Sequence, residues 1–534
     1  MMNIADLLAR GYFPLELPPP FTTAAFSSFV TTAATRPTGY LAPPASKPVT
    51  TKAVVHSVAR AGALRRRLSI PNPIAYEQLA TVVVDNWPTL LAHTSGSPIS
   101  LTTPRSTPGT GRAIVPVHSF ESWTRERARV RAGQRFVLKA DIASFYGSVY
   151  THSIPWAMHG KAVAKAARGL SHLGNLLDVL VRNGQDQQTI GIPIGPDTSL
   201  LLAEVLLSPV DKALPASMPS GLRYVDDYEF GCATQAEAEG CLAVIEEQLA
   251  SLELQLNPRK TSIRALPLPL EESWTPEIRL YRIRKGVSGQ ATDLLSFFGK
   301  AFALQPGCPE ASLLKYAVSR TRSEPIREEN WQLYEALLLQ CAAVEPGSLS
   351  TVVSQLLRYS AAGYAIGLVR VRDTFNRVIH AHGAVGHGSE VAWALWGAIE
   401  LGCTVSAAAA ASLSASNDAV VALLSLDAQA RGLIPAGLDT SRWEALLTSA
   451  DLRGSAWLLT YEAFVKGWLR PPGGSDIVSP DTYFAWLRDG GVSFYDTASR
   501  LPVTPPPPTP SAPSAASAEA TAEDALLLES FYGF

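Results

Sequence analysis

The sequence predicts an α+β region built on a split βαβ sheet, followed by an all-α region of helical-repeat type. Three observations lead to this prediction. Short apolar runs alternate with helical segments between residues 135 and 263, apolar stripes of helical spacing dominate after residue 290, and proline-rich stretches separate the parts. With 534 residues, 47% of them hydrophobic and 17% charged, the chain is long enough for two or three hydrophobic cores.

The α+β region is predicted from local patterns. The run FVLKAD is short and apolar, as in a buried strand, Thr234 with Glu237 forms a capping box that begins a helix, and LELQLN alternates like a strand. The predicted elements are, in order, a strand at 136–141, helices at 153–183 and 198–214, a hairpin of 221–225 and 228–232, a helix after 234, and a strand at 252–257. This order is that of a split βαβ unit.

The later part of the chain has a different character. After a proline-rich connector, leucine, valine and alanine recur at helical spacing, which indicates stacked helix pairs or an irregular helical bundle. The predicted divisions are an N-terminal extension (1–65), the α+β region (66–264), a connector (265–290), a helical region (291–500) and a Pro/Ala-rich tail (501–534).

Cysteine usage and hydropathy narrow the class of protein. The five cysteines are widely spaced and include no CxxC pair, which argues against a disulfide framework and against a zinc site. The N-terminus lacks the basic and apolar regions of a signal peptide, and no apolar stretch reaches about 18 residues. We therefore expect a cytoplasmic protein without a membrane partner.

Charge is unevenly distributed along the chain. The formal net charge of −2 does not by itself indicate nucleic-acid binding. Between Arg105 and Lys139, however, eight basic residues stand against two glutamates, and a second basic cluster with three arginines at 65–67 lies upstream. Taken alone, this pattern is more typical of a solvated charged surface, and a phosphate-binding surface is the alternative.

Three aspartates occur where predicted strands end. Asp141 closes the strand 136–141, while Asp226 and Asp227 form the tip of the hairpin. In a split βαβ sheet these places can be adjacent, although 85 residues separate Asp141 from Asp226. Carboxylates are the hard ligands that Mg²⁺ prefers, and two such ions about 4 Å apart support in-line phosphoryl transfer. A two-metal site is therefore predicted, and an ordinary acidic turn is the alternative.

The ordered set of motifs resembles that of reverse transcriptases. The matching segments are LKADIASFY (138–146, motif A), GIPIGPDTSLLLAE (191–204, motif B), RYVDDYEF (223–230, motif C), LNPRKT (256–261, motif D), and the fingers segments IPNPIAYEQLA (70–80) and GRAIVP (111–116). The resemblance implies a polymerase palm and fingers at 66–264 and RNA-directed DNA polymerase activity. It also implies two Mg²⁺ ions, with Mn²⁺ as an alternative, deoxynucleoside triphosphates as substrates, and an RNA or DNA template or primer.

The resemblance further implies roles for single residues. The implied site comprises the metal ligands Asp141, Asp226 and Asp227, the catalytic Lys260, and the nucleotide-binding Arg112, Ile142 (through its carbonyl), Tyr146 and Gly195. The ring of Tyr146 would exclude a ribose 2′ hydroxyl, with a packed palm aromatic as the alternative. Lys260 would donate a proton to the leaving pyrophosphate, with an ordinary surface lysine as the alternative. Arg112, or an arginine near it, would hold the triphosphate, and Gly195 would admit the nucleotide close to the backbone.

One position departs from the commoner motif B, because Ile194 stands where retroviral and group II intron enzymes have glutamine. The segment IPIGP instead resembles bacterial abortive-infection and other defence-associated reverse transcriptases, as do residues 11–21, residues 150–161 and the long helical region in place of a thumb. This implies antiphage defence, with a noncoding RNA and a homo-oligomer among the candidate partners. The alternatives are an idle polymerase-like scaffold that binds RNA or protein, a group II intron-type enzyme, and an RNA-dependent RNA polymerase, which Tyr146 disfavours.

The tail contains Tyr532 after a low-complexity linker. Some members of the resembled group start synthesis on a protein hydroxyl, and a linker of this length spans roughly 25–30 Å. Tyr532 is therefore a candidate primer, and a hydrophobic tail that docks on the helical region is the alternative.

Two groups of histidines could also bind a ligand. His380, His382 and His387 could hold a metal, but a glycine-rich helix break without cysteine is more typical of a loop. His152 and His159 flank Trp156 and are interpreted as structural.

Overall fold

Three of the predicted strands, at 136–141, 221–225 and 228–232, lie in one sheet of the α+β region, together with a strand at 262–265 that was not predicted. A computed structural model describes residues 2–37, 39, 40, 49–60, 64–109 and 111–502. The sheet has the order β6-β7-β5-β8. β5 (Phe136–Asp141) pairs antiparallel with both β7 (Asp227–Cys232) and β8 (Ser262–Ala265), and β6 (Gly221–Tyr224) pairs antiparallel with β7. β5 and β6 therefore run parallel with β7 between them, which is a split βαβ topology.

The two faces of this sheet have different environments because side chains alternate along a strand. Leu138, Tyr228 and Phe230 are buried on the face covered by α10 (Asp197–Ala213) and α11 (Gln235–Ala250). The opposite face carries Lys139 and Glu229, and there Glu229 binds α5 (Phe120–Arg131) through Arg127. The aspartates of the strand ends belong to this charged face.

The strand predicted at 252–257 is wrong. The helix α11 ends in a turn in which the Leu254 N–H donates to the Leu249 carbonyl at 3.1 Å and Glu253 adopts a left-handed φ of 62°. This turn buries Leu252 and Leu254 without strand pairing, and only Leu256 bridges to Ile142. The alternating leucines therefore reflect a helix-terminating turn, and the edge strand is β8, further along the chain.

The helix predicted at 153–183 is divided. Gly160, with a φ of 80°, ends the first part, and the chain continues as further helices. The remaining elements before the connector are α1 (Ile4–Arg10), α2 (Ala24–Thr32), β1 (Val54–Ala59), β2 (Arg65–Ile70), α3 (Pro73–Asp85), α4 (Trp87–Thr94), β3 (Pro104–Ser106), β4 (Ile114–Pro116), α6 (Phe145–Ser148), α7 (Ser153–His159), α8 (Lys161–Ala166) and α9 (Leu173–Asn183). β1 pairs with β2 and β3 with β4, both antiparallel.

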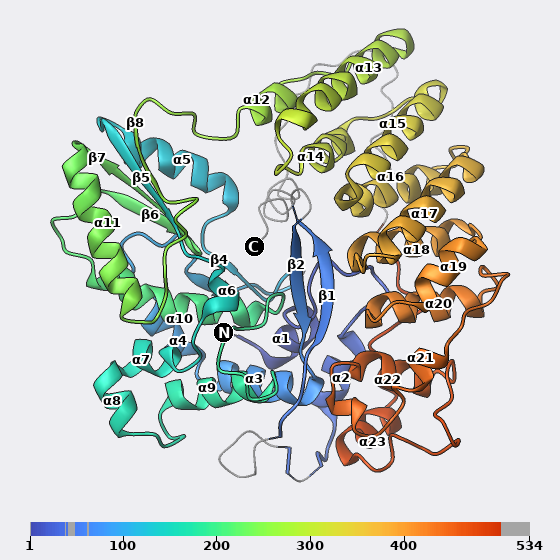
Figure 1. The fold of residues 1–534 in the computed structure, drawn as a ribbon, viewed down its shortest axis with the longest axis horizontal. Helices are drawn as coiled ribbons and strands as arrows, with labels where there is room; N and C mark the ends of the chain where they lie inside the picture. Colours follow the sequence, from blue (N-terminus) through green and yellow to red (C-terminus); the bar gives the residue numbers. More distant parts are fainter. Residues whose placement is uncertain (1, 38, 41–48, 61–63, 110, 503–534) are drawn as a thin grey trace.

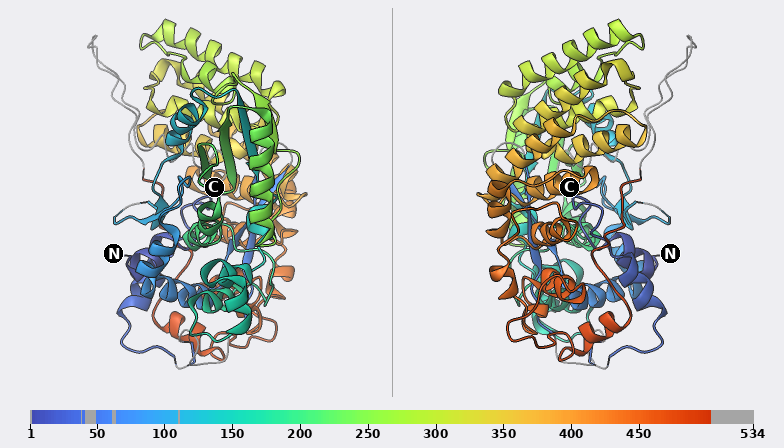
Figure 2. Two further views of the ribbon diagram at one scale, coloured as in Figure 1. Left: turned by 90° about the vertical axis from the view of Figure 1, so that its left-hand side faces the viewer. Right: turned by 90° about the vertical axis from the view of Figure 1, so that its right-hand side faces the viewer.

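From residue 274 onward the chain is largely helical, as predicted for 291–500, although α12 and the start of α13 lie inside the predicted connector (265–290). It comprises α12 (Trp274–Arg279), α13 (Val287–Leu304), α14 (Leu313–Arg320), α15 (Trp331–Val344), α16 (Leu349–Ala361), α17 (Leu368–Gly383), α18 (Gly388–Leu401), α19 (Ala407–Ser414), α20 (Ala419–Ala430), α21 (Ser441–Glu444), α22 (Trp457–Val465) and α23 (Thr482–Asp489). α15, α17 and α19 contact one another in succession, and so do α16, α18, α20 and α22. These contacts produce a two-layered array, which Figure 1 shows as an arc and Figure 2 shows from its outer side.

The helical array is bound to the N-terminal part of the chain. α18 and α20 pack against β1, the Trp457 indole donates to the Ile70 carbonyl at 3.2 Å, and the Asn72 amide donates to the Leu452 carbonyl at 2.8 Å. The array thus lies beside the β1–β2 pair, with the palm sheet on the other side in Figure 1. Within the described part of the chain, no helix is both long and apolar enough to cross a membrane.

Candidate active site

The three aspartates meet at one end of the palm sheet. Asp141, the last residue of β5, is directly opposite Asp227, the first residue of β7. Asp226 belongs to the two-residue turn between β6 and β7, and its carbonyl accepts the Ile142 N–H at 3.1 Å. The strand register therefore brings together carboxylates that lie 85 residues apart in sequence. We call Asp141, Asp226 and Asp227 the palm carboxylate cluster.

Electrostatics indicate that the palm carboxylate cluster is short of positive charge. Burial raises the pKa of Asp226 to about 6, and repulsion from Asp141 adds to this effect. Burial also raises the pKa of Asp227 to about 8, together with repulsion from Asp226 and Asp141. Three crowded carboxylates repel one another unless a cation or proton lies among them. Their hard oxygen atoms fit a pair of Mg²⁺ or Mn²⁺ ions.

Asp141 is held in place by two residues of the segment that follows α11, Asn257 and Lys260. The Lys260 ammonium donates to Asp141 Oδ2 at 2.7 Å, while 51% of the lysine side chain remains exposed. The Asn257 side-chain amide donates to Asp141 Oδ1 at 3.1 Å, and its backbone N–H donates to the Asp141 carbonyl at 2.7 Å. Lys260 therefore lies beside the palm carboxylate cluster, and a lysine near the three aspartates is what its implied role requires. Asn257 was not predicted, although it belongs to the same LNPRKT segment.

The turn between β6 and β7 has a strained backbone, and hydrogen bonds from buried side chains hold it in place. Val225 has a φ of 52°, a region that β-branched residues rarely adopt. Its N–H donates to Thr102 Oγ1 at 3.1 Å, and its carbonyl accepts from Arg223 Nη1 at 2.8 Å. Arg223 is fully buried between Glu204, at 2.7 Å, and Asp211, at 2.6 Å. This ion network positions the turn that presents Asp226 and Asp227. In the sequence, the basic Arg223 inside an otherwise apolar strand of the RYVDD motif could have indicated that a buried ion pair supports the turn.

Tyr146 lies next to the cluster, in the short helix α6 that follows β5. Burial raises the pKa of its hydroxyl, and the nearby carboxylates of Asp226 and Glu204 add to that effect. Its backbone carbonyl accepts the Ile192 N–H at 2.8 Å, which ties the segment after Asp141 to the segment before α10. The segment that carries Tyr146 is therefore fixed between the end of β5 and the start of α10, and the tyrosine hydroxyl is influenced by the charge of Asp226.

Arg112 and Gly195 are in contact with each other and with the N-terminal segment. The Arg112 guanidinium donates to Asp197, to the Phe13 carbonyl at 2.6 Å and to the Gly195 carbonyl at 2.6 Å. Gly195 has a φ of 126°, and a Cβ there would lie 2.6 Å from Pro14 Cγ. The close backbone approach at Gly195 is thus made by the protein's own proline, and three protein partners already surround Arg112.

Arg66 is a residue that the sequence interpretation did not single out. It lies on β2, and the residues that influence its charge include Tyr146 and Asp226. Burial lowers the pKa of its guanidinium. A guanidinium group is well suited to bind phosphate, because its planar set of N–H donors matches the phosphate oxygens. Because side chains alternate on a strand, Arg65 points the other way and binds Glu390 of the helical array. Strand periodicity across the three arginines could have separated these two roles.

A comparison with known families decides what this arrangement is. The family model described as reverse transcriptase (RNA-dependent DNA polymerase) matches residues 76–286. Residues 76–286 form a reverse transcriptase domain. The matched segment contains β5, β6 and β7 and so includes the whole palm carboxylate cluster. No curated protein matches the chain.

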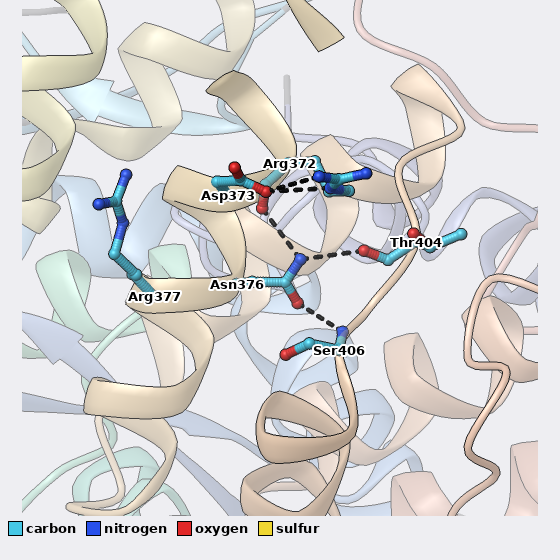
Figure 3. Close-up of a pocket in the computed structure, with 6 residues that line it drawn as sticks. All are labelled: Arg372, Asp373, Asn376, Arg377, Thr404 and Ser406. Atoms are coloured by element: carbon cyan, nitrogen blue, oxygen red, sulfur yellow. Dashed lines mark hydrogen bonds and ion pairs between the residues drawn. The ribbon is translucent and has the colours of Figure 1, made fainter. Parts of the chain in front are cut away.

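Two further features lie outside the palm carboxylate cluster: a surface hollow on α17 and the candidate primer Tyr532. A surface hollow on α17 is shown in Figure 3, where Arg377 points away from Asn376. The Asn376 amide is satisfied by backbone groups of Arg372, Thr404 and Ser406, so it ties α17 to the segment before α19. The candidate primer Tyr532 lies outside the described residues.

Proposed function

We propose that the palm carboxylate cluster catalyses DNA synthesis, templated or untemplated, by two-metal nucleotidyl transfer. The observation that carries this proposal is the register of β5 and β7, which sets Asp141 opposite Asp227 with Asp226 in the adjoining turn. The match of residues 76–286 to the reverse transcriptase family supports RNA as a template. The raised pKa values of Asp226 and Asp227 are a further support, since they follow from carboxylate crowding that a cation relieves.

The residues around the cluster have distinct tasks in this proposal. Asp141, Asp226 and Asp227 would hold two Mg²⁺ ions, and the carbonyl of Ile142 would be an additional oxygen ligand. When bound, the ions supply the Lewis acidity that activates a 3′ hydroxyl and stabilises the departing oxygen. Lys260, already within hydrogen-bonding distance of Asp141, donates a proton to the leaving pyrophosphate.

We assign the triphosphate to Arg66 in preference to Arg112. The charges of Asp226 and Tyr146 influence Arg66, whereas Arg112 would have to give up Asp197 and two carbonyl partners to bind a ligand. Gly195 then supports the site through its contact with Pro14. A triphosphate between Arg66 and the metal ions would place the sugar near the ring of Tyr146.

Nucleotide incorporation by purified full-length protein tests the proposal. Each labelled deoxynucleotide and each ribonucleotide is supplied with Mg²⁺ or Mn²⁺, with and without RNA or DNA templates and copurified nucleic acid. We expect deoxynucleotide incorporation that requires a divalent metal. An active wild-type protein that incorporates only ribonucleotides would contradict DNA synthesis, and a wild-type protein without any incorporation would support the idle scaffold.

The antiphage role rests on the resemblance of the IPIGP segment and of the long helical region to defence-associated enzymes. Its test is the plating efficiency of phages on bacteria that express the wild-type protein or the Asp226→Ala, Asp227→Ala variant. We expect protection from at least one phage by the wild type and none by the variant. Equal protection by both proteins would assign defence to the helical array alone.

Priming on Tyr532 is tested by mass spectrometry of the purified protein after nucleotide incubation. A nucleotide adduct on Tyr532 that the Asp226→Ala, Asp227→Ala variant lacks is the expected result. DNA free of protein, or DNA attached to another residue, would exclude the tail as the primer.

A further inference from the structure

Three potential metal ligands converge where α17 meets α18, far from the palm along the chain. His382 lies in the last turn of α17, His387 precedes α18, and Glu390 belongs to the first turn of α18. The Nδ1 atoms of the two histidines are 2.9 Å apart, and Glu390 Oε1 lies 4.0 Å from His382 Nδ1 and 3.7 Å from His387 Nδ1. We call these three residues the α17–α18 cluster.

The local chain conformation explains why these side chains meet. The His387 N–H donates to the His382 carbonyl at 3.0 Å, so the connection folds back on the end of α17. Gly386 adopts a left-handed φ of 71°, which the reversal requires and which glycine permits. Glu390 follows His387 by three residues and therefore lies on the same side of the helix start. The cluster is thus formed by a short segment of chain.

The spacing of the three ligand atoms fits a small tetrahedral cation. Zinc bonds to nitrogen and oxygen are about 2.0–2.2 Å long, which places ligand atoms about 3.4 Å apart in a tetrahedron. The observed separations of 2.9, 3.7 and 4.0 Å lie on both sides of that value. Two imidazole nitrogens with one carboxylate suit Zn²⁺ or a related transition metal better than Mg²⁺, which prefers oxygen ligands.

The surroundings of the cluster also favour a metal. Arg65 binds both oxygens of Glu390, with Nη2 2.7 Å from Oε2, and Ser389 Oγ donates to Oε2 at 2.7 Å. Such outer partners fix a ligating carboxylate, and a carboxylate has about four lone-pair positions, so Oε1 can still accept a cation.

We propose that His382, His387 and Glu390 bind one Zn²⁺ ion, with water as the fourth ligand. The ion joins the end of α17 to the start of α18, and through Glu390 and Arg65 it stabilises the contact between the helical array and β2. His380, which the sequence grouped with the other two histidines, is not a ligand. Its Nδ1 lies 3.1 Å from Ser412 Oγ, on another side of α17.

Metal content of the full-length protein, purified without a histidine tag, tests this proposal. After equilibration with equimolar Zn²⁺ and gel filtration, we expect about one zinc per chain in the wild type. The His382→Ala, His387→Ala variant should retain less than about a tenth of that amount, because two of three protein ligands are removed. His380→Ala is the matched control, and it should retain the wild-type amount. The Asp226→Ala, Asp227→Ala variant should do so too, which separates this site from the palm.

A spectroscopic measurement on the unmodified protein covers the case in which the histidine variant does not fold. Co²⁺ in a tetrahedral nitrogen and oxygen site absorbs strongly in the visible range, and Zn²⁺ should displace it. Visible absorption that saturates at one equivalent of Co²⁺ and disappears with Zn²⁺ supports the site. A wild-type protein that retains no zinc and shows no such absorption, or a folded histidine variant that retains zinc like the wild type, overturns it.

Discussion

The palm carboxylate cluster and the α17–α18 cluster both bring titratable side chains close together, but they do so by different structural means. Both hold titratable side chains at short distances, and in both a basic residue binds a carboxylate: Lys260 binds Asp141 and Arg65 binds Glu390. The proposed palm ligands are carboxylate oxygens brought together across 85 residues by strand register, whereas the proposed α17–α18 ligands lie within one helix–turn–helix segment and include two imidazoles.

This difference teaches how the position of a cluster relates to its chemistry. Oxygen ligands that face a half-exposed lysine suit labile Mg²⁺ ions and an exchanging substrate. Imidazoles in a short connection, with Arg65 behind the carboxylate, suit a retained structural ion. We therefore expect changes in the palm carboxylate cluster to alter chemistry, and changes in the α17–α18 cluster or in the buried ion network below the palm turn to alter stability; four experiments can break or sharpen that division.

The largest effect is expected for Asp226→Ala combined with Asp227→Ala. Removing two metal ligands should lower DNA synthesis by on the order of 10³-fold or more, since bound metal contributes several kcal/mol to transition-state stabilisation. Without divalent metal the variant should unfold at the same or a higher temperature than the wild type, because crowded carboxylates are removed. Incorporation assays and circular dichroism measure the two effects. Undiminished synthesis would refute the assignment of the palm site.

A substantial loss of stability is expected for Arg223→Met. The substitution leaves Glu204 and Asp211 buried without their cation, which typically costs about 3–5 kcal/mol of unfolding free energy. Denaturant unfolding measures the loss. Arg284→Met is the matched control, because Arg284 forms an exposed pair with Asp293 and its removal should change stability little. If both variants lose the same stability, the buried network does not support the palm turn.

A smaller loss is expected for Arg65→Met, which leaves the buried carboxylate of Glu390 without its guanidinium partner. An unpaired buried hydrogen-bonding group costs about 1–3 kcal/mol. Zinc should recover part of this loss, since the ion supplies the missing positive charge at Glu390. Denaturant unfolding with and without Zn²⁺ measures both values. An equal loss in the two conditions would speak against a metal beside Glu390.

The smallest effect is expected for Tyr146→Ala. If the ring excludes a ribose 2′ hydroxyl by contact, its removal should raise ribonucleotide relative to deoxynucleotide incorporation by about 10-fold. Single-nucleotide incorporation gives the ratio of kcat/KM values, and Tyr150→Ala, on the segment after α6, serves as the control. An unchanged ratio for Tyr146→Ala would make this tyrosine a packing residue, so that sugar selection would lie elsewhere.

The sequence by itself determined the core of the palm. FVLKAD forms β5 at the predicted residues, because period-two burial acts locally. The hairpin was predicted from the acidic break at Asp226 and Asp227, but its turn lies one residue earlier, because Val225 takes the left-handed φ and Asp227 already belongs to β7. Once the hairpin register is fixed, the positions of Asp226 and Asp227 follow. The helical character of the later region was likewise predictable from its apolar spacing.

Helix periodicity could also have excluded His380 from a site with His382. Residues two positions apart do not share a helix face, whereas His387 and Glu390, three positions apart, do. What the sequence could not decide is that the end of α17 and the start of α18 meet.

Only the tertiary structure decided which partners the remaining residues have. Arg65 binds Glu390 and Arg112 is enclosed by Asp197 and the segment before Pro14, although these partners are distant in sequence. The leucines after α11 were misassigned because a helix-ending turn and a strand bury alternating residues equally well. Local patterns specify which side chains are buried, but only the packed chain specifies what each buried or half-buried charge lies against.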